Sequence, residues 1–323
     1  KKIINKNKLQ QQIDINSQII AFENIKNSYK NLKIIRIGFD LYSDLNPHTL
    51  KNNMRKIKYP EIVAEVTTNH RGNTQVLKRI IEGCISSGVN IIKFQKRDVE
   101  NFYSKKKLDS AYETPISKTF REYRSKLELN LSQLKLIKKY EKKFKLKIIF
   151  SILDFKSYLS LKKLGFKYFK IPSTISLHHN FIKQMSKENL KEIIISTGMT
   201  NENYVKKVIK IFSKVKKLYL LHAISSYPTY YQSINLKIVS EYSKFRNKFK
   251  KIIPGYSSHD MGSVGSMLAV AAGAEMIEKH VKIGDHEWMH YDDVAIDVYD
   301  ELPDFVNNIK KATLIMGKKT KKI

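Results

Sequence analysis

Two histidines, His259 and His280, follow two short apolar runs and enclose a segment with the character of a helix, GYSSHDMGSVGSMLAVAAGAEMIEKH (255–280). If residues 252–257 and 276–280 are neighbouring parallel strands, both imidazoles lie at the carboxyl ends of strands, where one metal ion could contact both. In the alternative, His259 caps the following helix and His280 only ends a strand. The spacing alone favours this simpler alternative.

Charged side chains occur inside other apolar runs. A strand buried on both faces should be almost wholly apolar, so a charge within it is costly unless it faces a ligand or another charge. Four residues have this character: Glu65, Lys93, Lys170 and Glu278. An internal layer of paired Lys and Glu is one explanation. A functional site is favoured because hydroxyls and imidazoles gather at the same ends of the runs.

The types of these residues predict an anionic substrate and a divalent ion. Two lysines with several Ser and Thr hydroxyls and backbone amides would bind a phosphate or a carboxylate. Two histidines, with oxygen ligands from substrate, Glu278 or water, suit Mn²⁺ or Mg²⁺ better than a structural zinc, which typically takes four protein ligands.

A regular alternation of predicted strands and helices begins near Pro60 and would position these residues. A Val/Ile/Phe-rich run is followed by a segment with helical periodicity, and the pair recurs roughly every 25 to 35 residues. The pattern predicts parallel strands at 62–66, 90–94, 147–152, 168–173, 192–197, 217–223, 252–257 and 276–281, and helices that include 74–87 and 300–316.

Eight such pairs predict an α/β protein, a closed (β/α)8 TIM barrel over residues 58–323 with a short N-terminal extension over residues 1–57. A doubly wound open sheet is the rival fold. It needs a Gly-rich phosphate turn after its first strand, and EVTTNHRG (65–72) is not one. The extension is rich in Lys, Asn and Gln, and its role is not predicted.

The chain is strongly basic, with 60 Lys and Arg against 30 Asp and Glu among 323 residues. Such an excess suggests nucleic acid or an anionic membrane as a partner. The lysines, however, are spread over nearly every amphipathic segment, which favours a solvated basic surface and an anionic small-molecule pocket. No nucleic-acid partner is predicted.

The cysteine content and the lengths of the apolar runs restrict where in the cell we expect the protein. A single cysteine, Cys84, excludes an intramolecular disulfide framework and suits a reducing cytoplasm. The longest nearly apolar run, 267–274, is far too short to cross a bilayer. We therefore expect a cytoplasmic protein without a membrane partner.

Seven sequence blocks, in this order, resemble the sialic acid synthase family: AEVTTNHRGN (64–73), IIKFQ (91–95), FKIPS (169–173), STGM (196–199), LHAISSYPTYY (221–231), GYSSH (255–259) and IEKH (277–280). The resemblance covers residues 60 to about 317. It implies a metal-dependent barrel enzyme that condenses phosphoenolpyruvate with an N-acylated amino-sugar aldose. The products would be a nonulosonic (sialic-like) acid and phosphate.

The same resemblance implies a role for individual residues. His259 and His280 would ligate the metal, with Mn²⁺ as the first expectation and Mg²⁺ or Co²⁺ as alternatives. Glu65 would be the carboxylate near the reacting carbons. Phosphoenolpyruvate would be held by Lys93, Lys170, Ser173, Ser196, Ser225 and Ser257. The sugar would be faced, or the site ordered, by Asn69, Gln95, Tyr227, Glu278 and Asp292.

Departures from the family pattern concentrate on the acceptor side. The acidic sugar contact usual in the family is replaced by Ile175, the Ser-Asp-His block reads SSH (257–259), and the Pro-Gly-Pro-Asp segment becomes EWMHYDD (287–293). The antifreeze-like C-terminal domain, which in many members reaches across a homodimer, is not expected here. The resemblance therefore supports the phosphoenolpyruvate half of the site and leaves the acceptor sugar open.

Two other functions compete with this prediction. An aldolase of the same architecture would form a Schiff base between Lys170 or Lys93 and a keto acid. A non-catalytic barrel would use its basic surface to bind a polyanion.

Overall fold

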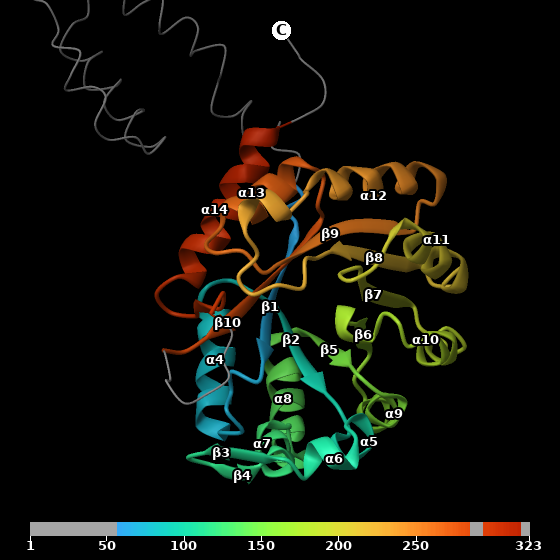
Figure 1. Ribbon diagram of the computed structural model, residues 1–323. Helices are drawn as coiled ribbons and strands as arrows, with labels where there is room; N and C mark the ends of the chain where they lie inside the picture. Colours follow the sequence, from blue (N-terminus) through green and yellow to red (C-terminus); the bar gives the residue numbers. More distant parts are fainter. Residues whose placement is uncertain (1–56, 285–292, 318–323) are drawn as a thin grey trace, which may run out of the picture. The chain divides into compact units, whose positions relative to one another are not determined.

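The computed structural model describes residues 57–284 and 293–317, so the N-terminal extension predicted for residues 1–57 lies almost wholly outside the described residues. Within these ranges, eight parallel strands form the barrel: β1 (Glu61–Thr67), β2 (Ile91–Lys96), β5 (Lys147–Ile152), β6 (Tyr168–Ile171), β7 (Glu192–Ser196), β8 (Lys217–His222), β9 (Ile252–Ser258) and β10 (Met276–Lys282). Each strand pairs with the next, and β10 pairs with β1, which closes the sheet (Figure 1). The predicted (β/α)8 TIM barrel is confirmed.

A helix follows each barrel strand and covers the outside of the sheet (Figure 1). These helices are α4 (Thr74–Ser86), α8 (Leu131–Phe144), α9 (Phe155–Lys163), α10 (His179–Met185), α11 (Glu202–Ile211), α12 (Lys237–Lys248), α13 (Val264–Ala271) and α14 (Leu302–Met316). The short 3-10 turns η2 (Ser173–Ile175) and η3 (Tyr231–Ser233) precede α10 and α12. The strand β11 (Ile296–Asp297) pairs with the end of β10.

The longest insertion within the described barrel lies between β2 and α8. It contains α5 (Val99–Phe102), α6 (Lys105–Leu108), the antiparallel hairpin β3 (Ala111–Thr114) and β4 (Ser117–Thr119), and α7 (Phe120–Leu127). Its aromatic residues pack on one another, with Tyr112 and Tyr123 rings 4.6 Å apart. The insertion therefore has a small apolar cluster of its own beside the carboxyl end of β2.

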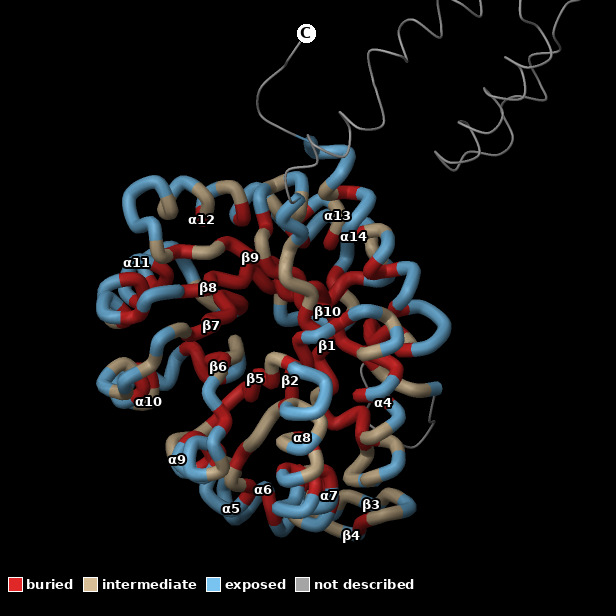
Figure 2. Tube along the Cα trace, turned by 180° about the vertical axis from the view of Figure 1, so that it is seen from behind, coloured by how far each residue is buried: buried red, intermediate tan, exposed pale blue. Residues whose placement is uncertain are grey.

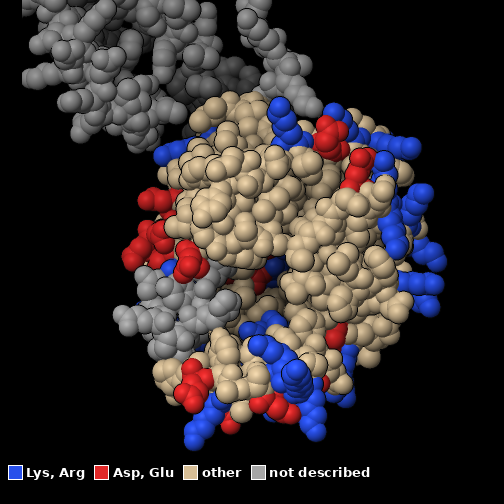
Figure 3. Space-filling model, in the orientation of Figure 1, with Lys and Arg blue, Asp and Glu red and all other residues tan. Residues whose placement is uncertain are grey.

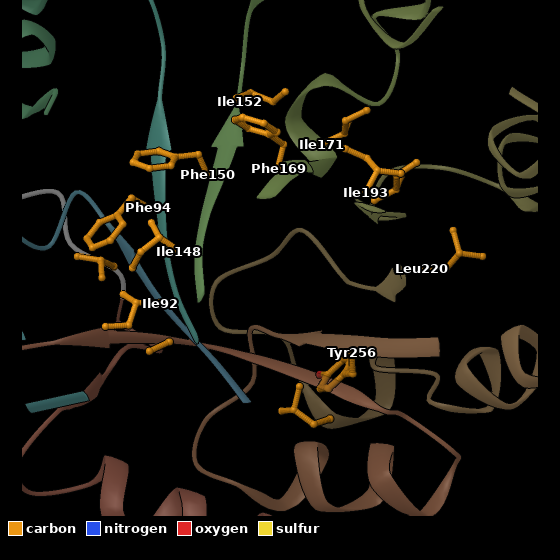
Figure 4. Packing of buried hydrophobic residues seen from close by; sticks show 14 of the residues in the cluster. Ile92, Phe94, Ile148, Phe150, Ile152, Phe169, Ile171, Ile193, Leu220 and Tyr256 are labelled. Atoms are coloured by element: carbon orange, nitrogen blue, oxygen red, sulfur yellow. The ribbon is translucent and has the colours of Figure 1, made fainter. Parts of the chain in front are cut away.

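The strands are apolar on both faces because each face packs against a different layer. Outward residues such as Ile92, Ile148 and Phe150 pack under the helices in one large cluster (Figure 4). Inward residues form a second cluster, the barrel plug: Val63, Ile91, Ile149, Ile194, Tyr219, Leu221 and Met276. The buried strands and the exposed outer faces of the helices are separated clearly in Figure 2. Each fully buried aliphatic side chain contributes roughly 1.5–3 kcal/mol.

Side-chain caps fix where several of the helices begin after their strands. Asn73 accepts hydrogen bonds from the amides of Gln75 and Val76, and Asp154 accepts one from Ser157. Asn130 and Gln133 form a capping box at the start of α8. Such caps typically contribute about 1 kcal/mol each. They define the lengths of the loops at the carboxyl ends of the strands.

The strands lie within two residues of the predicted ranges at every boundary. The largest differences, of two residues, are at the ends of β2, which continues to Lys96, and of β6, which ends at Ile171 because Pro172 is already the N-cap of η2. Among the described residues, no helix combines the length and the apolar composition that crossing a bilayer requires.

Candidate active site

A cavity of about 390 Å³ opens at the carboxyl ends of the barrel strands. Figure 3 shows this hollow near the centre of the molecule, with atoms of basic and acidic side chains inside it. Twelve of the predicted site residues line the cavity: Glu65, Lys93, Gln95, Lys170, Ser173, Ser196, Ser225, Tyr227, Ser257, His259, Glu278 and His280. They come from six strands of the barrel, β1, β2, β6, β7, β9 and β10, and from the loops that follow β6, β8 and β9.

Two predicted residues are not placed on this wall. Asn69 is buried beside β10, where its side-chain amide donates a 2.9 Å hydrogen bond to the carbonyl of Val281. This contact ties the loop after β1 to the neighbouring strand, so the structure gives Asn69 a scaffolding contact and not a place on the cavity wall. Asp292 lies outside the described residues.

The parallel register explains why the charged residues meet. Glu65 is paired with Lys93 on one side and with His280 on the other, and Glu278 is paired with Ser257. Neighbours in register point to the same face of the sheet. Here that face is the interior of the barrel, so residues far apart in sequence form one floor.

The floor of the cavity is organised by the carboxylate of Glu278. Its Oε1 accepts hydrogen bonds from Lys170 Nζ at 2.7 Å, Lys93 Nζ at 2.8 Å and Ser257 Oγ at 2.9 Å. Lys93 also forms an ion pair with Glu65. The charges therefore face one another, as the paired-charge alternative expected, but they do so at the base of a cavity.

Burial and these contacts shift the pKa values of the charged side chains at the floor of the cavity. Burial alone would raise the pKa of Glu278, but the ammonium groups of Lys170 and Lys93 outweigh it and hold that pKa well below its usual value. The pKa of Lys93 is lowered well below its usual value, first by burial and then by the positive charge of Lys170, against the opposing effect of Glu278. Glu278 is therefore a fixed anion that positions two ammonium groups.

Glu65 is held by a residue that the sequence analysis did not select, Thr67. The Thr67 amide and hydroxyl both donate to Glu65 Oε1, at 2.8 and 3.0 Å. Thr67 has a φ of 48° at an irregularity in the pairing of β1 with β2. A β-branched residue rarely adopts this conformation, which costs on the order of 1–3 kcal/mol. The strained turn orients the carboxylate of Glu65.

The two histidines meet at one side of the mouth, with ring centroids 5.4 Å apart. The Nδ1 of His259 lies 2.5 Å from the carbonyl oxygen of Ile224, which can only accept, so we assign the ring proton to Nδ1. Burial, followed by the nearby His280, lowers the pKa of His259 to about 3. The cap of α13 is Ser263, so the alternative in which His259 caps that helix is wrong.

His280 has the corresponding arrangement through Thr67. The Thr67 hydroxyl lies 3.1 Å from His280 Nδ1 and donates its proton to the carboxylate of Glu65. Nδ1 of His280 must then donate, and Nε2 carries the lone pair. Both imidazoles thus have the tautomer in which Nε2 can bind a metal while Nδ1 is held by an oxygen, the arrangement usual for histidine ligands.

The donor set fits a divalent ion with an incomplete protein shell. Within residues 57–284 and 293–317, no group of three or more His, Cys, Asp and Glu side chains is arranged to hold a metal. Tyr227 donates from its hydroxyl to Nε2 of His259 at 2.9 Å. Any ion at the two histidines would therefore take its remaining ligands from substrate or water, as expected for Mn²⁺ or Mg²⁺ and not for structural zinc.

The wall contains four further polar residues outside the predicted set: Thr67, Arg97, Ser151 and Thr174. The hydroxyl of Ser151 is buried and has no hydrogen-bond partner among the described residues. Arg97 could have been found from the alternation that already gave Lys93 and Gln95. Ile175, at the position of the usual acidic sugar contact, is buried in the outer core, and Thr174 lines the cavity.

A second polar network lies behind the histidines and was also missed. The carboxylate of Asp260 accepts hydrogen bonds from Tyr256 at 2.6 Å and from Ser258 at 2.7 Å. The ammonium group of Lys279, which is fully buried, donates to the backbone carbonyl of Asp260. These contacts link the ends of β9 and β10, which carry His259 and His280.

Comparison with known proteins agrees with the resemblance in the sequence blocks. The model of the NeuB family matches residues 80–321. N-acetylneuraminate-9-phosphate synthase of Homo sapiens is 29% identical over 265 residues, which cover 81% of this chain and 72% of that protein. N,N'-diacetyllegionaminic acid synthase of Campylobacter jejuni is 33% identical over 226 residues, which cover 68% of this chain and 66% of that protein. A crystal structure of the N-acetylneuraminic acid synthetase of Leptospira borgpetersenii has a TM-score of 0.69 and 25% identity, and covers 82% of this chain and 87% of that one.

Proposed function

This chain belongs to the NeuB family, and we propose that it is a synthase that condenses phosphoenolpyruvate with an N-acylated amino-sugar aldose. The products are a nonulosonic acid and phosphate, and the reaction depends on a divalent metal ion, Mn²⁺ first. The activities for which its relatives are named support the reaction class, because those relatives are synthases of sialic and legionaminic acids. A homodimer in the cytoplasm, acting on small molecules, completes the proposal.

The observation that carries this proposal is the convergence of Lys93 and Lys170 on one carboxylate at the base of a cavity that also contains both histidines. Two ammonium groups held 2.8 and 2.7 Å from Glu278 Oε1 are pre-positioned for an enol phosphate, which carries negative charge on both its phosphate and its carboxylate. Because the lysines are already ordered, binding costs little further side-chain entropy.

A cradle of hydroxyls beside the lysines supports a phosphate at this end of the cavity. The amide of Gly198 donates to Ser173 Oγ at 3.1 Å, and a Cβ at Gly198 would lie 2.6 Å from Ser173 Oγ and 2.7 Å from Ser225 Oγ. Only glycine fits between the two hydroxyls. Both serines therefore approach one backbone segment closely enough to bind the same phosphate.

Glu65 is the residue that we assign to the chemistry at carbon 2. Carbon 3 of the enol phosphate attacks the acceptor aldehyde, positive charge develops at carbon 2, and water adds there. The Glu65 carboxylate, oriented by Thr67, stabilises that charge and deprotonates the water. Phosphate then leaves by carbon–oxygen cleavage, and the two lysines stabilise its departure.

His259 and His280 are the residues that would hold the metal ion. When bound there, a divalent ion would polarise the aldehyde oxygen of the acceptor as a Lewis acid. The hydrogen bonds of Nδ1 to Ile224 and Thr67 leave Nε2 of each ring as the nitrogen that would bind the ion, and at His259 the ion would displace the Tyr227 hydroxyl from Nε2. Tyr227 lies against His259, with ring centroids 4.1 Å apart, and lines the same cavity.

The test is phosphate release from phosphoenolpyruvate in the presence of a panel of N-acyl aldoses. We expect release that requires an acceptor, is abolished by EDTA and is restored by Mn²⁺. Lys170→Met should remove it, whereas Lys162→Met, at an exposed ion pair with Glu188, should not. Acceptor-independent release, or release unaffected by EDTA, would contradict the proposal.

One observation favours a second candidate, a Schiff-base aldolase. The lowered pKa of Lys93, caused by burial and by Lys170, is a property of lysines that act as nucleophiles. Borohydride reduction in the presence of pyruvate would leave a covalent adduct on Lys93 if this reaction occurs. An unmodified lysine after this treatment, with acceptor-dependent phosphate release, supports the synthase.

A further inference from the structure

The backbone pairing of β9 with β10 stops just before the two histidines. The last pair in register is Ser258 with Lys279, so His259 lies beyond the end of its strand, whereas His280 remains paired with Glu65 of β1. The main-chain hydrogen bonds of the sheet therefore hold His280, but they do not hold His259 against it. If both rings bind one ion, their separation must be fixed, so other contacts must set the position of His259.

The side chain of Lys279 supplies a contact across this gap. Its ammonium group donates to the backbone carbonyl of Asp260, the residue after His259, and to the hydroxyl of Ser258 at 3.3 Å. The carbonyl of His259 itself accepts a 2.7 Å hydrogen bond from the amide of Thr229. Both carbonyls are thus held, one by a side chain of β10 and the other by the loop after β8.

The side chain of Asp260 anchors the same turn. Its Oδ1 accepts hydrogen bonds from the Tyr256 hydroxyl at 2.6 Å and from the Ser258 hydroxyl at 2.7 Å, so Ser258 joins Asp260 to Lys279. Helix α13 packs directly on the carboxylate, because a Cβ at Gly265 would lie 2.4 Å from Oδ2. The glycine leaves room for the carboxylate. The turn after β9 is therefore fixed by contacts with β9, β10 and α13.

The burial of these charges argues for a role other than stability. Lys279 and Asp260 are both completely buried. Lys279 alternates with Glu278 and His280, so it points away from the cavity, into the layer where Ile277 packs in the large apolar cluster. Apolar residues of similar volume are often more stable at such positions than charged ones. A positional role therefore explains the lysine better than stability does.

We propose that Ser258, Asp260 and Lys279, here called the histidine support, position His259 relative to His280 for the binding of one divalent ion. Asp260 follows His259 in the sequence, and Lys279 precedes His280. None of the three lines the cavity, so they act through the backbone next to the histidines. This inference rests on the metal ion of the proposed function and assigns the residues that hold its two protein ligands in place.

Loss of the support should weaken the binding of the ion without removing a ligand. Lys279→Met replaces the ammonium group by an apolar end and removes its hydrogen bond to the carbonyl of Asp260. Mn²⁺ should then bind roughly 10- to 100-fold more weakly, the usual effect of losing an outer contact of a metal site. Tyr256→Phe removes one of the two hydrogen bonds to Asp260, keeps both charges and should weaken binding roughly 2- to 10-fold.

The experiment measures Mn²⁺ binding by calorimetry, with the full chain freed of metal and without substrates. The matched control is Tyr158→Phe on α9, which loses a buried tyrosine hydroxyl that donates to Glu188 at 2.7 Å. Urea unfolding of the metal-free proteins should show a similar loss of stability for Tyr158→Phe and Tyr256→Phe. Of these two variants, only Tyr256→Phe should bind Mn²⁺ more weakly than the unaltered protein.

The outcomes separate this inference from the proposed function. Equal Mn²⁺ affinity in Tyr256→Phe and the unaltered protein overturns the histidine support, and so does equal weakening in Tyr158→Phe, which would be an effect of stability alone. Tyr256→Phe decides the inference if Lys279→Met does not fold. If the unaltered protein binds no Mn²⁺, the support and the metal dependence of the proposed function are both wrong. If the support variants alone bind Mn²⁺ more weakly but no acceptor gives phosphate release, the support stands and the condensation fails.

Discussion

The barrel interior consists of two layers that differ in chemistry although both are buried. The plug contains Val63 on β1, Ile149 on β5 and Met276 on β10, each completely buried. Two residues further along the same strands are Glu65, Ser151 and Glu278, which are 2–4% exposed. The apolar plug and the polar floor are therefore two residues apart along the same strands, and burial alone does not distinguish the two layers.

The difference shows which layer stabilises the fold and which layer is retained at a cost. The plug removes apolar surface from water, which is favourable throughout. The polar floor buries two lysines and two glutamates, and such charges are often less stable than apolar residues of similar volume even when they are paired. We infer that the plug supports a floor whose composition is set by the reaction. The predictions below test this division.

The largest effect is expected at the floor, for Glu65→Gln. Turnover should fall about 1000-fold, because a neutral amide neither stabilises positive charge nor takes a proton. Binding of phosphoenolpyruvate, measured by calorimetry, should be nearly unchanged, since Lys93 and Lys170 keep Glu278 as a partner. Glu61→Gln, at the opposite end of β1, is the matched control and should leave turnover close to normal. A Glu65→Gln protein with near-normal turnover would remove Glu65 from the mechanism.

The fold followed from the sequence because its signals are local and repeated. Apolar runs such as IIF (148–150) and III (193–195) occur once per unit, and eight parallel strands with crossover helices form this barrel. Helix starts were also readable, since Asn73 and Asp154 have the residue types of caps. Two strand ends differ from the prediction by two residues, because β2 continues in register with β5 to Lys96 and β6 ends at Ile171, before Pro172.

The candidate site could be predicted from the sequence only in part, because residue type does not determine where a side chain points. Charged residues within strands identified the floor. The role of Thr67 depends on a φ of 48°, which no pattern at that position predicts. Asn69 has the type of a binding residue, yet its amide is used by the backbone of Val281. The direction of Ile175 into the outer core depends on the turn η2 and could not be read from the sequence.

A smaller effect, on stability and not on turnover, is expected from a pair of substitutions on β5. Ile149→Ala should lower the free energy of unfolding by about 2–5 kcal/mol, because it leaves a cavity in the plug. Ser151→Ala, two residues away, removes a buried hydroxyl that has no hydrogen-bond partner within residues 57–284 and 293–317, so its effect should be within about 0.5 kcal/mol of zero. Urea unfolding measures both. Equal destabilisation by the two substitutions would contradict the division into layers.

The smallest effect is expected for Thr67→Val, which tests how the floor is joined to the histidines. Valine keeps the β-branched shape and the strained backbone at a φ of 48°, so stability should change little. It removes the hydroxyl that donates to Glu65 and holds His280 Nδ1. Loss of one such hydrogen bond should lower kcat roughly 10-fold with little change in the KM for phosphoenolpyruvate.

Thr67→Ser is the matched variant, because it keeps the hydroxyl while losing only a methyl group. It should retain most of the turnover that Thr67→Val loses. If Thr67 acted only through the shape of the turn, the valine variant, which keeps that shape, would lower kcat less than the serine variant does. Recovery by serine and not by valine therefore identifies the hydroxyl as the link that positions Glu65 relative to His280.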